Sequence, residues 1–404
     1  MAREMKNSGV EWIGSIPKAW CVTRVKDISS ISSGTYISKD EYYDNGEYPI
    51  IGSNGEIGKS NKANNNNPVV TTGRVGTIGT AHIVDDAWIT DNTLIINPGS
   101  KVCIKYLSYL IPNIDFDLLS TGTAQPLITA TKLGRQYIPL PSVEEQLEIV
   151  NLLDIECSRA DSSIEKTKVS IEEYKKLKQA IITEAVTKGI RPNRKMKDSG
   201  SAWFGVIPAD WQMKKLKYQF SICKDIAGEE GYQVLSITQH GIIPKNIESN
   251  EGQIANDYSN YQLVNIGDFA MNHMDLLTGW VDVSRYEGVT SPDYRVFKLI
   301  DSDNNSDRYY LYMMQMCYFN RIFYGLGQGV SGMGRWRLQT YKFQNFLIAI
   351  PSKEEQLEIA DYLDRKCEAI DLLIERKEAL LVELLSYKKS LIFEYVTGKR
   401  AVRI

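Results

Sequence analysis

One sequence frame occurs twice in this chain, and this duplication constrains the fold more than any other feature. Residues 138–187 align without a gap on residues 348–397, at a constant offset of 210 and with 21 identities in 50 positions. A shorter segment around Trp12 repeats around Trp203, at an offset of 191. Each copy therefore consists of an opener, a variable block and a long tail.

The variable blocks between opener and tail differ in both sequence and length. From Lys6 to Ile138 the chain advances 132 residues, and from Lys197 to Ile348 it advances 151. A repeated frame that holds unlike inserts favours a constant scaffold that presents two different recognition surfaces.

The two tails predict long helices. Ser142 is the expected N-cap of the first, and Glu145 stands three residues later, which is the spacing of a capping box. Ser352 and Glu355 repeat this pattern in the second tail. A helix of roughly 45 residues is about 68 Å long, which is far more than the core of one domain needs.

A seam of period 3.5 runs along both tails, as is typical of a coiled coil. In the first tail the seam contains Val150, Leu153, Cys157, Ala160, Ile164, Thr167, Ile171, Tyr174, Lys178, Ile181 and Ala185. In the second tail it contains Ala360, Leu363, Cys367, Ile370, Ile374, Lys377, Leu381, Leu384, Lys388, Leu391 and Tyr395. We expect the tails to pair with each other, with Lys178 and Lys388 setting the register at some cost in stability.

Each variable block predicts a domain of short strands, turns and a little helix. In the first block we expect strands over 48–51, 69–72, 77–83 and 93–96, and a helix over 101–110 that Pro112 closes. In the second block we expect strands over 233–238, 268–272, 281–284 and 294–299, and a helix over 307–324. The predicted fold class is therefore α+β, internally duplicated, with two globular heads separated by two long helices that pair as an antiparallel coiled coil.

Two glycine-rich segments resemble nucleotide-binding loops but fail on spacing or context. The segment 52–60 has Ser53 where a P-loop needs glycine, and the polar run after it cannot open a helix. Gly327, Gly329 and Gly332 match a dinucleotide fingerprint, yet they follow a helix-like aromatic run. The hypothesis that the chain is a nucleotide-using enzyme therefore rests only on these two segments.

Charge, cysteine content and hydropathy bear on the class of binding partner and on the cellular compartment. Lys plus Arg is 47 and Asp plus Glu is 50, so the net charge of −3 shows no whole-chain basic excess for nucleic acid. Six scattered cysteines fit reduced thiols, and three dispersed histidines suggest neither a metal site nor a catalytic triad. The start lacks an apolar signal core and no run could span a membrane, so we expect a cytoplasmic chain.

Three motifs together resemble the DNA-sequence specificity subunit of type I restriction-modification enzymes. They are the tail motif at 138–146 and 348–356, the Trp-x-Gly-x-Ile-Pro-x-x-Trp opener that starts at Trp12 and Trp203, and the segment 70–79. Residues 288–294 are also similar to one recurrent version of the family's target recognition domain. The resemblance covers essentially the whole chain.

This resemblance implies a non-catalytic subunit whose two target recognition domains each bind one half of a bipartite, asymmetric site in double-stranded DNA. The expected domains are 1–141 and 192–351, with spacer helices at 142–191 and 352–404. Two DNA methyltransferase (modification) subunits would assemble on the helices, with two restriction/translocase subunits where the system includes them. No cofactor is expected in this chain: S-adenosylmethionine, and ATP with Mg, would bind the partners.

Base edges are read by Arg, Lys, Asn and Gln, whereas Lys, Arg, Ser and Thr hold phosphates. The candidate DNA-binding residues lie near turns and loop ends, where binding residues concentrate. In the first block they are Asn54, Lys59, Lys62, Thr72, Arg74, Gln125, Lys132 and Arg135. In the second block they are Gln239, His240, Lys245, Asn272, His273, Gln328, Arg335, Arg337 and Lys342.

The alternative hypothesis is a coiled-coil scaffold whose two heads bind protein rather than DNA, and it draws on the net charge of −3. Residues 1–141 hold 13 basic and 13 acidic side chains, and residues 197–351 hold 14 and 16. If DNA is the partner, the chain alone should bind it weakly, with other subunits neutralising many of the phosphates.

Overall fold

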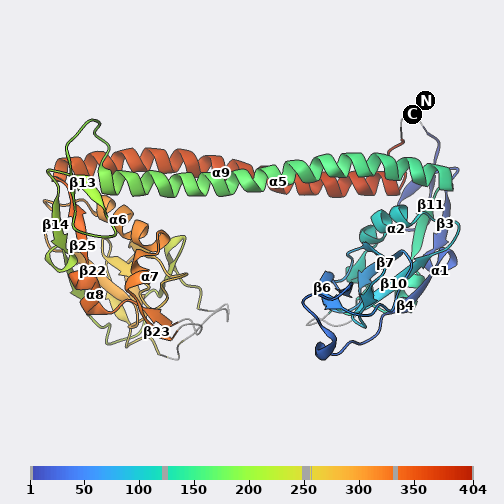
Figure 1. Ribbon diagram of the computed structural model, residues 1–404, viewed down its shortest axis with the longest axis horizontal. Coiled ribbons are helices and arrows are strands. Elements are labelled where there is room, and N and C mark those ends of the chain that lie inside the picture. Colours follow the sequence, from blue (N-terminus) through green and yellow to red (C-terminus); the bar gives the residue numbers. More distant parts are fainter. Residues whose placement is uncertain (1–2, 121–125, 248–254, 256, 331–334, 403–404) are drawn as a thin grey trace. The chain divides into compact units, whose positions relative to one another are not determined.

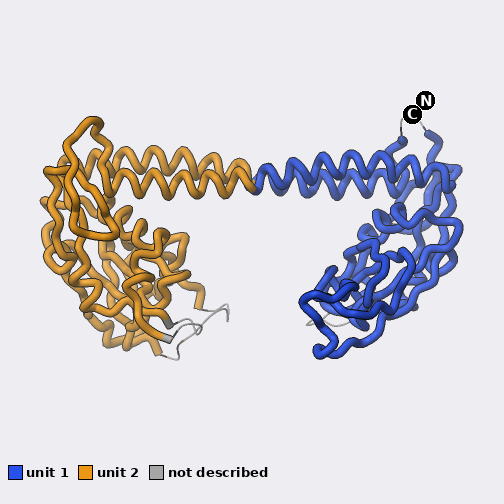
Figure 2. Tube along the Cα trace, viewed as in Figure 1, with its two compact units in different colours: residues 1–168, 379–404 blue, residues 169–378 orange. Residues whose placement is uncertain are grey.

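A computed structural model describes residues 3–120, 126–247, 255, 257–330 and 335–402. It forms two compact units, each built from one variable block and parts of both tails (Figure 2). Unit 1 comprises Met1–Lys168 and Ala379–Ile404, and unit 2 comprises Val169–Glu378. Each unit thus takes the start of one tail helix and the end of the other.

The elements of the first copy are short strands and helices that precede one long helix. The strands are β1 (Met5–Asn7), β2 (Ser15–Pro17), β3 (Cys21–Arg24), β4 (Ser29–Ser33), β5 (Tyr48–Gly52), β6 (Gly55–Ser60), β7 (Val69–Gly73), β8 (His82–Val84), β9 (Trp88–Ile89), β10 (Thr93–Pro98) and β11 (Tyr137–Leu140). The helices are α1 (Val25–Ile28), α2 (Ile104–Leu110), α3 (Phe116–Leu119), α4 (Ala130–Gly134) and the long α5 (Val143–Lys188).

The second copy repeats this plan with more strands. Its strands are β12 (Met196–Asp198), β13 (Val206–Pro208), β14 (Gln212–Lys215), β15 (Phe220–Cys223), β16 (Leu235–Thr238), β17 (Gly241–Pro244), β18 (Gln262–Val264), β19 (Phe269–Met271), β20 (Val281–Val283), β21 (Gly288–Thr290), β22 (Arg295–Leu299), β23 (Gln328–Val330), β24 (Arg335–Arg337) and β25 (Leu347–Ile350). Its helices are α6 (Asp307–Phe319), α7 (Ile322–Leu326), α8 (Thr340–Asn345) and the long α9 (Lys353–Val396).

Both heads contain the same four-stranded antiparallel sheet. Its strand order is β4-β10-β7-β8 in unit 1 and β15-β22-β19-β20 in unit 2. The pair β3–β11 in unit 1 likewise corresponds to β14–β25 in unit 2. The duplicated frame therefore extends into the variable blocks, where the alignment of the two sequences does not reveal it.

The heads differ in what is added to this sheet. Unit 1 carries the three-stranded sheet β6-β5-β9, whereas unit 2 carries the pairs β16–β17, β18–β21 and β23–β24. In Figure 1, β6 and β23 lie on the side of their own head away from the long helices. The parts unique to each head are thus attached to a shared core.

The long helices confirm the predicted coiled coil. Every seam residue of both tails is buried or half-buried in the structure. Within each unit, the two helix segments run side by side in opposite directions (Figure 1). The predicted α+β class, with two heads and antiparallel paired helices, is therefore confirmed.

Two ion pairs join the helices at the polar seam positions. Lys178 Nζ lies 2.6 Å from Asp371 in unit 2, and Lys388 Nζ lies 2.6 Å from Asp161 in unit 1. The residues of one pair stand 210 positions from their counterparts in the other, so the pairs are copies. Each lysine side chain is about 30% exposed. The acid of the opposite helix compensates its charge at the seam.

Reversing one of these charges should test their role in register. We expect Lys178→Glu to lower the free energy of unfolding by about 1 kcal/mol, because it loses a partly exposed ion pair and places two acids together. The double variant Lys178→Glu/Asp371→Lys should recover most of that loss in urea denaturation. No recovery in this double-mutant cycle would contradict a direct interaction.

The first turns of α5 and α9 confirm one half of the predicted capping boxes. Ser142 Oγ accepts the Glu145 amide at 3.3 Å, and Ser352 Oγ accepts the Glu355 amide at 3.4 Å. The second hydrogen bond of the capping box, from the serine backbone amide to the glutamate carboxylate, is not formed in either helix. Each carboxylate instead accepts a hydrogen bond from an opener tryptophan, with the two partners far apart in sequence.

We call this arrangement the Trp-Glu-Arg cluster: Trp20, Glu145 and Arg3 in unit 1, and Trp211, Glu355 and Arg194 in unit 2. The indole Nε1 lies 2.8 Å from the carboxylate in unit 1 and 3.0 Å in unit 2. The arginine pairs with the same carboxylate, and its guanidinium lies 5.3 or 5.8 Å from the indole ring. The cluster attaches each opener to the first turn of a tail helix.

The glutamine after the paired acids also bonds to a residue distant in sequence. Gln146 Oε1 accepts the amide of Cys103, the residue before α2, at 2.7 Å. Gln356 Oε1 accepts the amide of Ser306, the N-cap of α6, at 2.8 Å. Both side chains are fully buried. The repeated Glu-Glu-Gln motif therefore holds each head to its tail helix.

Two predicted elements differ from the structure. The expected strand 77–83 is wrong apart from β8, because residues 74–80 form a loop that folds back on Gly73. A Cβ at Gly73 would lie 1.7 Å from the Thr77 carbonyl oxygen, so the loop needs glycine there. The expected helix 307–324 is divided into α6 and α7, because Arg321 adopts a left-handed conformation with a φ of 56°. The other expected strands and the helix before Pro112 are confirmed with shifted ends.

Candidate nucleic-acid interface

In unit 1, the loop 74–80 is the meeting point of several predicted DNA-binding segments. The Thr80 hydroxyl donates to the Ser53 carbonyl at 3.3 Å, which places this loop beside the turn that carries Asn54. On its other side, Arg74 O accepts the Ile128 amide at 2.9 Å. Arg74 Nη1 donates to the Asp91 carbonyl at 3.1 Å, so its guanidinium is held at this junction.

The remaining candidates of unit 1 lie at other places. Lys59 is exposed on β6, while Lys62 pairs with Glu41 and lies 4.9 Å from the Trp88 ring. Lys132 Nζ donates to the Leu119 carbonyl at 3.0 Å, and Arg135 is exposed at the end of α4. Two of these side chains thus lie on or just after β6 and the other two on or just after α4.

One candidate of unit 1 is not a surface group. Thr72 is only 1% exposed, and its hydroxyl has no hydrogen-bond partner among the described residues. We therefore leave Thr72 out of the proposed interface. Gln125 lies outside the described residues.

In unit 2, most candidates gather around the loop that follows β19. Gln239, next to His240 in the turn between β16 and β17, donates to the Thr278 carbonyl of this loop at 3.3 Å. The loop itself holds Asn272 and His273, and the His273 carbonyl accepts the Leu338 amide just after β24. Gln328 and Arg337 face each other across the β23–β24 pair.

Aromatic contacts hold this β23–β24 pair in place. Trp336 Nε1 donates to the Tyr324 carbonyl at 2.8 Å, and the two rings lie 5.5 Å apart. The side chain of Arg335 is outside what the structure describes. Lys342 lies on α8, which contacts the segment after β14.

A buried arginine places positive charge beneath the same loop. Arg295 is 3% exposed and donates to the Leu338 carbonyl at 3.0 Å, while its guanidinium lies 4.5 Å from the Phe343 ring. No carboxylate of the described residues pairs with it, and burial lowers its pKa to about 10. Arg295 therefore remains charged at neutral pH and ties β22 to the segment after β24.

His273 is not a cation at neutral pH. Burial, followed by the charges of Arg295 and Arg337, lowers the pKa of His273 to about 3. Its Nδ1 is buried without a partner among the described residues. Any role of His273 in binding is therefore that of a neutral hydrogen-bonding group rather than a partner for phosphate.

A cavity of about 600 Å³ opens beside this group in unit 2. The predicted residues Lys245, Asn272 and Arg337 line it, together with Asp293 and Tyr294, which sequence reasoning missed as site residues. The signal that could have found them is the motif 288–294, which includes both. Asp293 is acidic and therefore differs from the basic and amide residue types that usually indicate DNA contacts.

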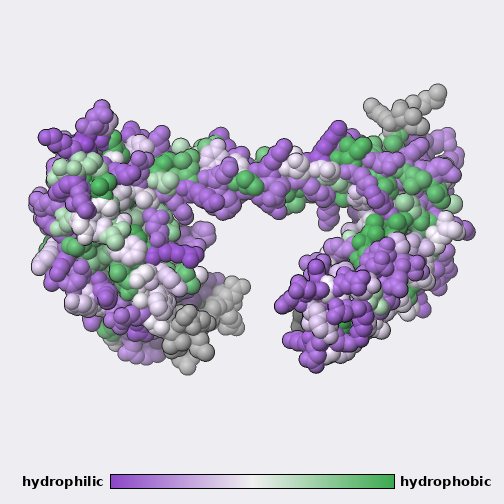
Figure 3. Space-filling view, viewed as in Figure 1, coloured by the Kyte–Doolittle hydropathy of each residue, from purple (hydrophilic) through white to green (hydrophobic). Residues whose placement is uncertain are grey.

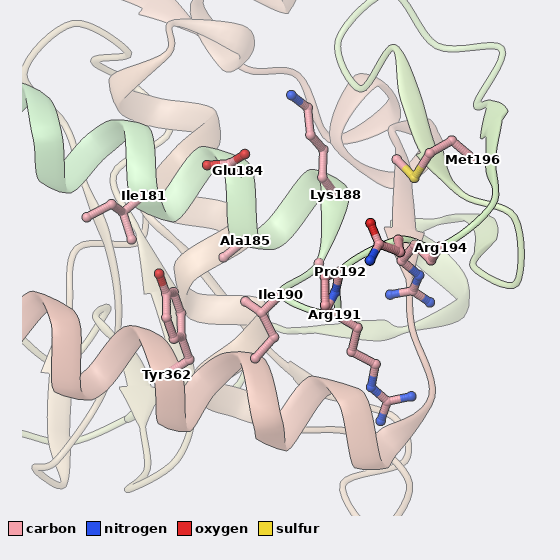
Figure 4. Close-up of a pocket in the computed structure, with 12 residues that line it drawn as sticks. Ile181, Glu184, Ala185, Lys188, Ile190, Arg191, Pro192, Arg194, Met196 and Tyr362 are labelled. Atoms are coloured by element: carbon pink, nitrogen blue, oxygen red, sulfur yellow. The ribbon is translucent and has the colours of Figure 1, made fainter.

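Four further cavities in the described part of the chain are lined by none of the predicted DNA-binding residues. The pocket of about 570 Å³ in Figure 4 lies where the chain leaves α5 for the second opener, between α5 and Tyr362 of α9. Arg191 and Arg194 line it, and both are paired with glutamates of α9. Its charges thus serve the attachment of the opener to the helix.

The long helices expose apolar side chains away from their seam. In unit 1 these include Val382 at 67% and Ile155 at 55% exposure, and in unit 2 Leu177 and Leu372 at 47% and 46%. Figure 3 shows hydrophobic patches among hydrophilic side chains along the helices. Contiguous exposed apolar surface often marks a protein-binding site.

The described residues offer neither a metal site nor a membrane-spanning helix. No group of His, Cys, Asp or Glu in them could hold a metal ion. No helix within the same ranges is long and apolar enough to cross a membrane.

The family model for the type I restriction modification DNA specificity domain matches residues 17–173 and again residues 209–382. The chain belongs to this family. The two matches reproduce the duplication, and each covers one head with the adjoining part of a long helix.

Curated relatives carry the same family name. The chain is 26% identical over 299 residues to the type I restriction enzyme MjaVIII specificity subunit of Methanocaldococcus jannaschii, covering 70% of this chain and 66% of that protein. A putative MjaX specificity subunit of the same organism is 31% identical over 131 residues, which are 31% of this chain and 29% of that protein. This chain thus matches just under two thirds of the first relative's length.

A solved structure shares the fold over nearly the whole chain. It comes from work on "complex assembly and conformational transition of the type I R-M system" and has a TM-score of 0.66 at 15% sequence identity. The match covers 95% of this chain and 99% of that one. At this identity the likeness supports the fold alone.

Proposed function

We propose that this chain is the DNA-recognition subunit of a type I restriction-modification complex, with each head binding one half of a bipartite, asymmetric site. The observation that carries the proposal is the shared four-stranded sheet with unlike additions in the two heads. One frame with two different attachments suits a protein that positions two different reading surfaces in the same way. The family match supports this proposal.

The proposed division of labour follows the four segments of the sequence. Residues 1–141 and 192–351 would bind DNA, and the helices within 142–191 and 352–404 would set the spacing and carry two methyltransferase subunits. Exposed apolar residues such as Val382 and Leu372 support a docking role for the helices. Restriction subunits would join through the assembled complex, which would act in the cytoplasm.

The partner subunits would carry out the catalytic steps. The proposal gives this chain no catalytic residue and no cofactor of its own. Target adenines would be extruded from the duplex into the methyltransferase, which would bind S-adenosylmethionine. ATP with Mg would bind the restriction subunit where one is present. Methylation of DNA by the isolated chain would overturn this assignment.

A salt series tests DNA binding by the complex loaded with methyltransferase subunits. Each neutralised phosphate contributes about −0.9 to the slope of log affinity against log salt. For six or more phosphate contacts, we expect affinity for a duplex with the full site to fall about 10³-fold between 50 and 200 mM salt. Titration calorimetry or fluorescence anisotropy would measure it.

The control is a duplex of the same length and composition with both half-sites scrambled. It should bind more weakly with a similar salt dependence, since phosphate contacts do not depend on sequence. A flat salt response, with no preference for the full site, would instead fit a scaffold whose heads bind protein.

A further inference from the structure

The motif 288–294 builds one wall of the cavity in unit 2. Gly288 opens the motif, and a Cβ there would lie 2.2 Å from the Gln233 carbonyl oxygen, so only glycine allows this approach. The buried Thr290 hydroxyl donates to the Leu235 carbonyl of β16 at 3.1 Å. The motif is thus fixed against β16, whose residues line the same cavity.

A buried glutamine fixes the turn at the end of the motif. Gln262 Nε2 donates to the Ser291 carbonyl at 2.8 Å and to the Tyr294 carbonyl at 2.7 Å. The Asp293 amide donates to Ser291 Oγ at 3.2 Å. The backbone around Asp293 is therefore rigid, while its exposed carboxylate forms no hydrogen bond or ion pair with any described residue.

Asn272 presents a fixed donor to the same cavity. Its Oδ1 accepts the amides of Met274 and Asp275 at 3.2 and 3.3 Å, which determines the orientation of the side-chain amide. The Tyr318 hydroxyl also donates to the Asn272 carbonyl at 2.7 Å. The Nδ2 group makes no hydrogen bond to a described residue and remains available as a donor.

A carboxylate at the position of Asp293 weakens the binding of DNA through its phosphates. Arg337 lines the same cavity and suits a phosphate, whereas a carboxylate repels phosphates. Among the bases, only exocyclic amino groups offer donors in the major groove, namely N4 of cytosine and N6 of adenine. A carboxylate without a protein partner therefore favours a base with such a group over one without it.

We infer that Asp293 is a specificity determinant of the second half-site, accepting a hydrogen bond from the amino group of a cytosine or an adenine. Asn272 Nδ2 donates to an acceptor on the same or the adjacent base pair. Arg337 beside them holds the DNA backbone. This inference rests on the proposed function and assigns the cavity in unit 2 a base-reading role.

The test uses the complex with methyltransferase subunits and a pool of duplexes with all four bases at each half-site position. Methylation rates of wild type and Asp293→Asn are compared by sequencing the methylated products. We expect discrimination at one position of the second half-site to fall about 5- to 150-fold, the range for one base contact. The first half-site and the salt slope should remain unchanged.

Asp303→Asn is the matched control, because it removes the same charge from the same unit outside the cavity. Asp303 is exposed in the loop before α6, next to Ser302, whose carbonyl accepts Lys353 Nζ of α9. It should leave discrimination unchanged at every position. Asn272→Ala should relax discrimination within one base pair of the position that Asp293 governs.

Unchanged discrimination in Asp293→Asn, or a uniform loss of affinity across all sequences, would overturn the inference. A change confined to the first half-site would do the same. If the wild-type complex itself shows no sequence preference, the proposed function fails first, and the two failures are thereby distinguished.

Discussion

Glu355→Ala should destabilise unit 2 by about 3 kcal/mol, the low end of the range for breaking a buried ion pair. The Glu355 side chain is 2% exposed, and its carboxylate accepts Trp211 Nε1 and pairs with Arg194. Its removal leaves the indole N–H without an acceptor in a buried place. Arg194 keeps its pair with Asp210 at 2.6 Å, which limits the loss.

The duplication supplies a matched control in Glu145→Ala. This glutamate has the equivalent partners of unit 1, Trp20 and Arg3. Its side chain is 23% exposed, however, and that of Arg3 is 30% exposed. Because water can replace part of the lost interaction, we expect a cost of only about 1 kcal/mol. Equal costs for the two variants would contradict the dependence on burial.

Hydrogen exchange of the full-length chain would separate these effects. Protection of peptides from the second opener and the start of α9 should fall in Glu355→Ala, while peptides of the first opener keep theirs. Glu145→Ala should show the reverse, with a smaller change. Urea denaturation would give the total free energies.

Removing one heptad from each long helix should shorten the gap between the two DNA half-sites by about three base pairs. Seven residues of helix span about 10.5 Å, and each base pair of the duplex occupies about 3.4 Å. Deleting 164–170 together with 374–380 removes equivalent residues of the two tails. Lys178–Asp371 and Lys388–Asp161 both stay in register, because the separation along each helix shrinks equally.

Methylome sequencing of cells that carry this double deletion would measure the gap. The sequences of both half-sites should be unchanged, since neither head is altered. Deleting 164–170 alone is the control: it should abolish a functional complex, because the two ion pairs can no longer form together. Altered half-site sequences with an unchanged gap would refute the spacer role.

Local patterns predicted those parts of the fold that depend on local physics. The heptad seam identified α5 and α9 with their pairing, and Ser142 and Ser352 were correct as N-caps. Residues 77–80 of the loop 74–80 were predicted as part of a strand, because their sequence suits either state. The choice between them depends on the approach of Thr77 to Gly73, which is a packing contact rather than a propensity.

The sequence by itself determined the duplication, the two paired helices and the resemblance to a family, because identity and period can be counted along the chain. Tertiary structure decided the partners of single side chains. Glu145 fits a capping box by its spacing, but it binds Trp20, which lies 125 positions away. Asp293 belongs to the motif 288–294, but only the tertiary structure places it in one cavity with Asn272 and Arg337. Such contacts join distant segments, and no local pattern encodes which segments will meet.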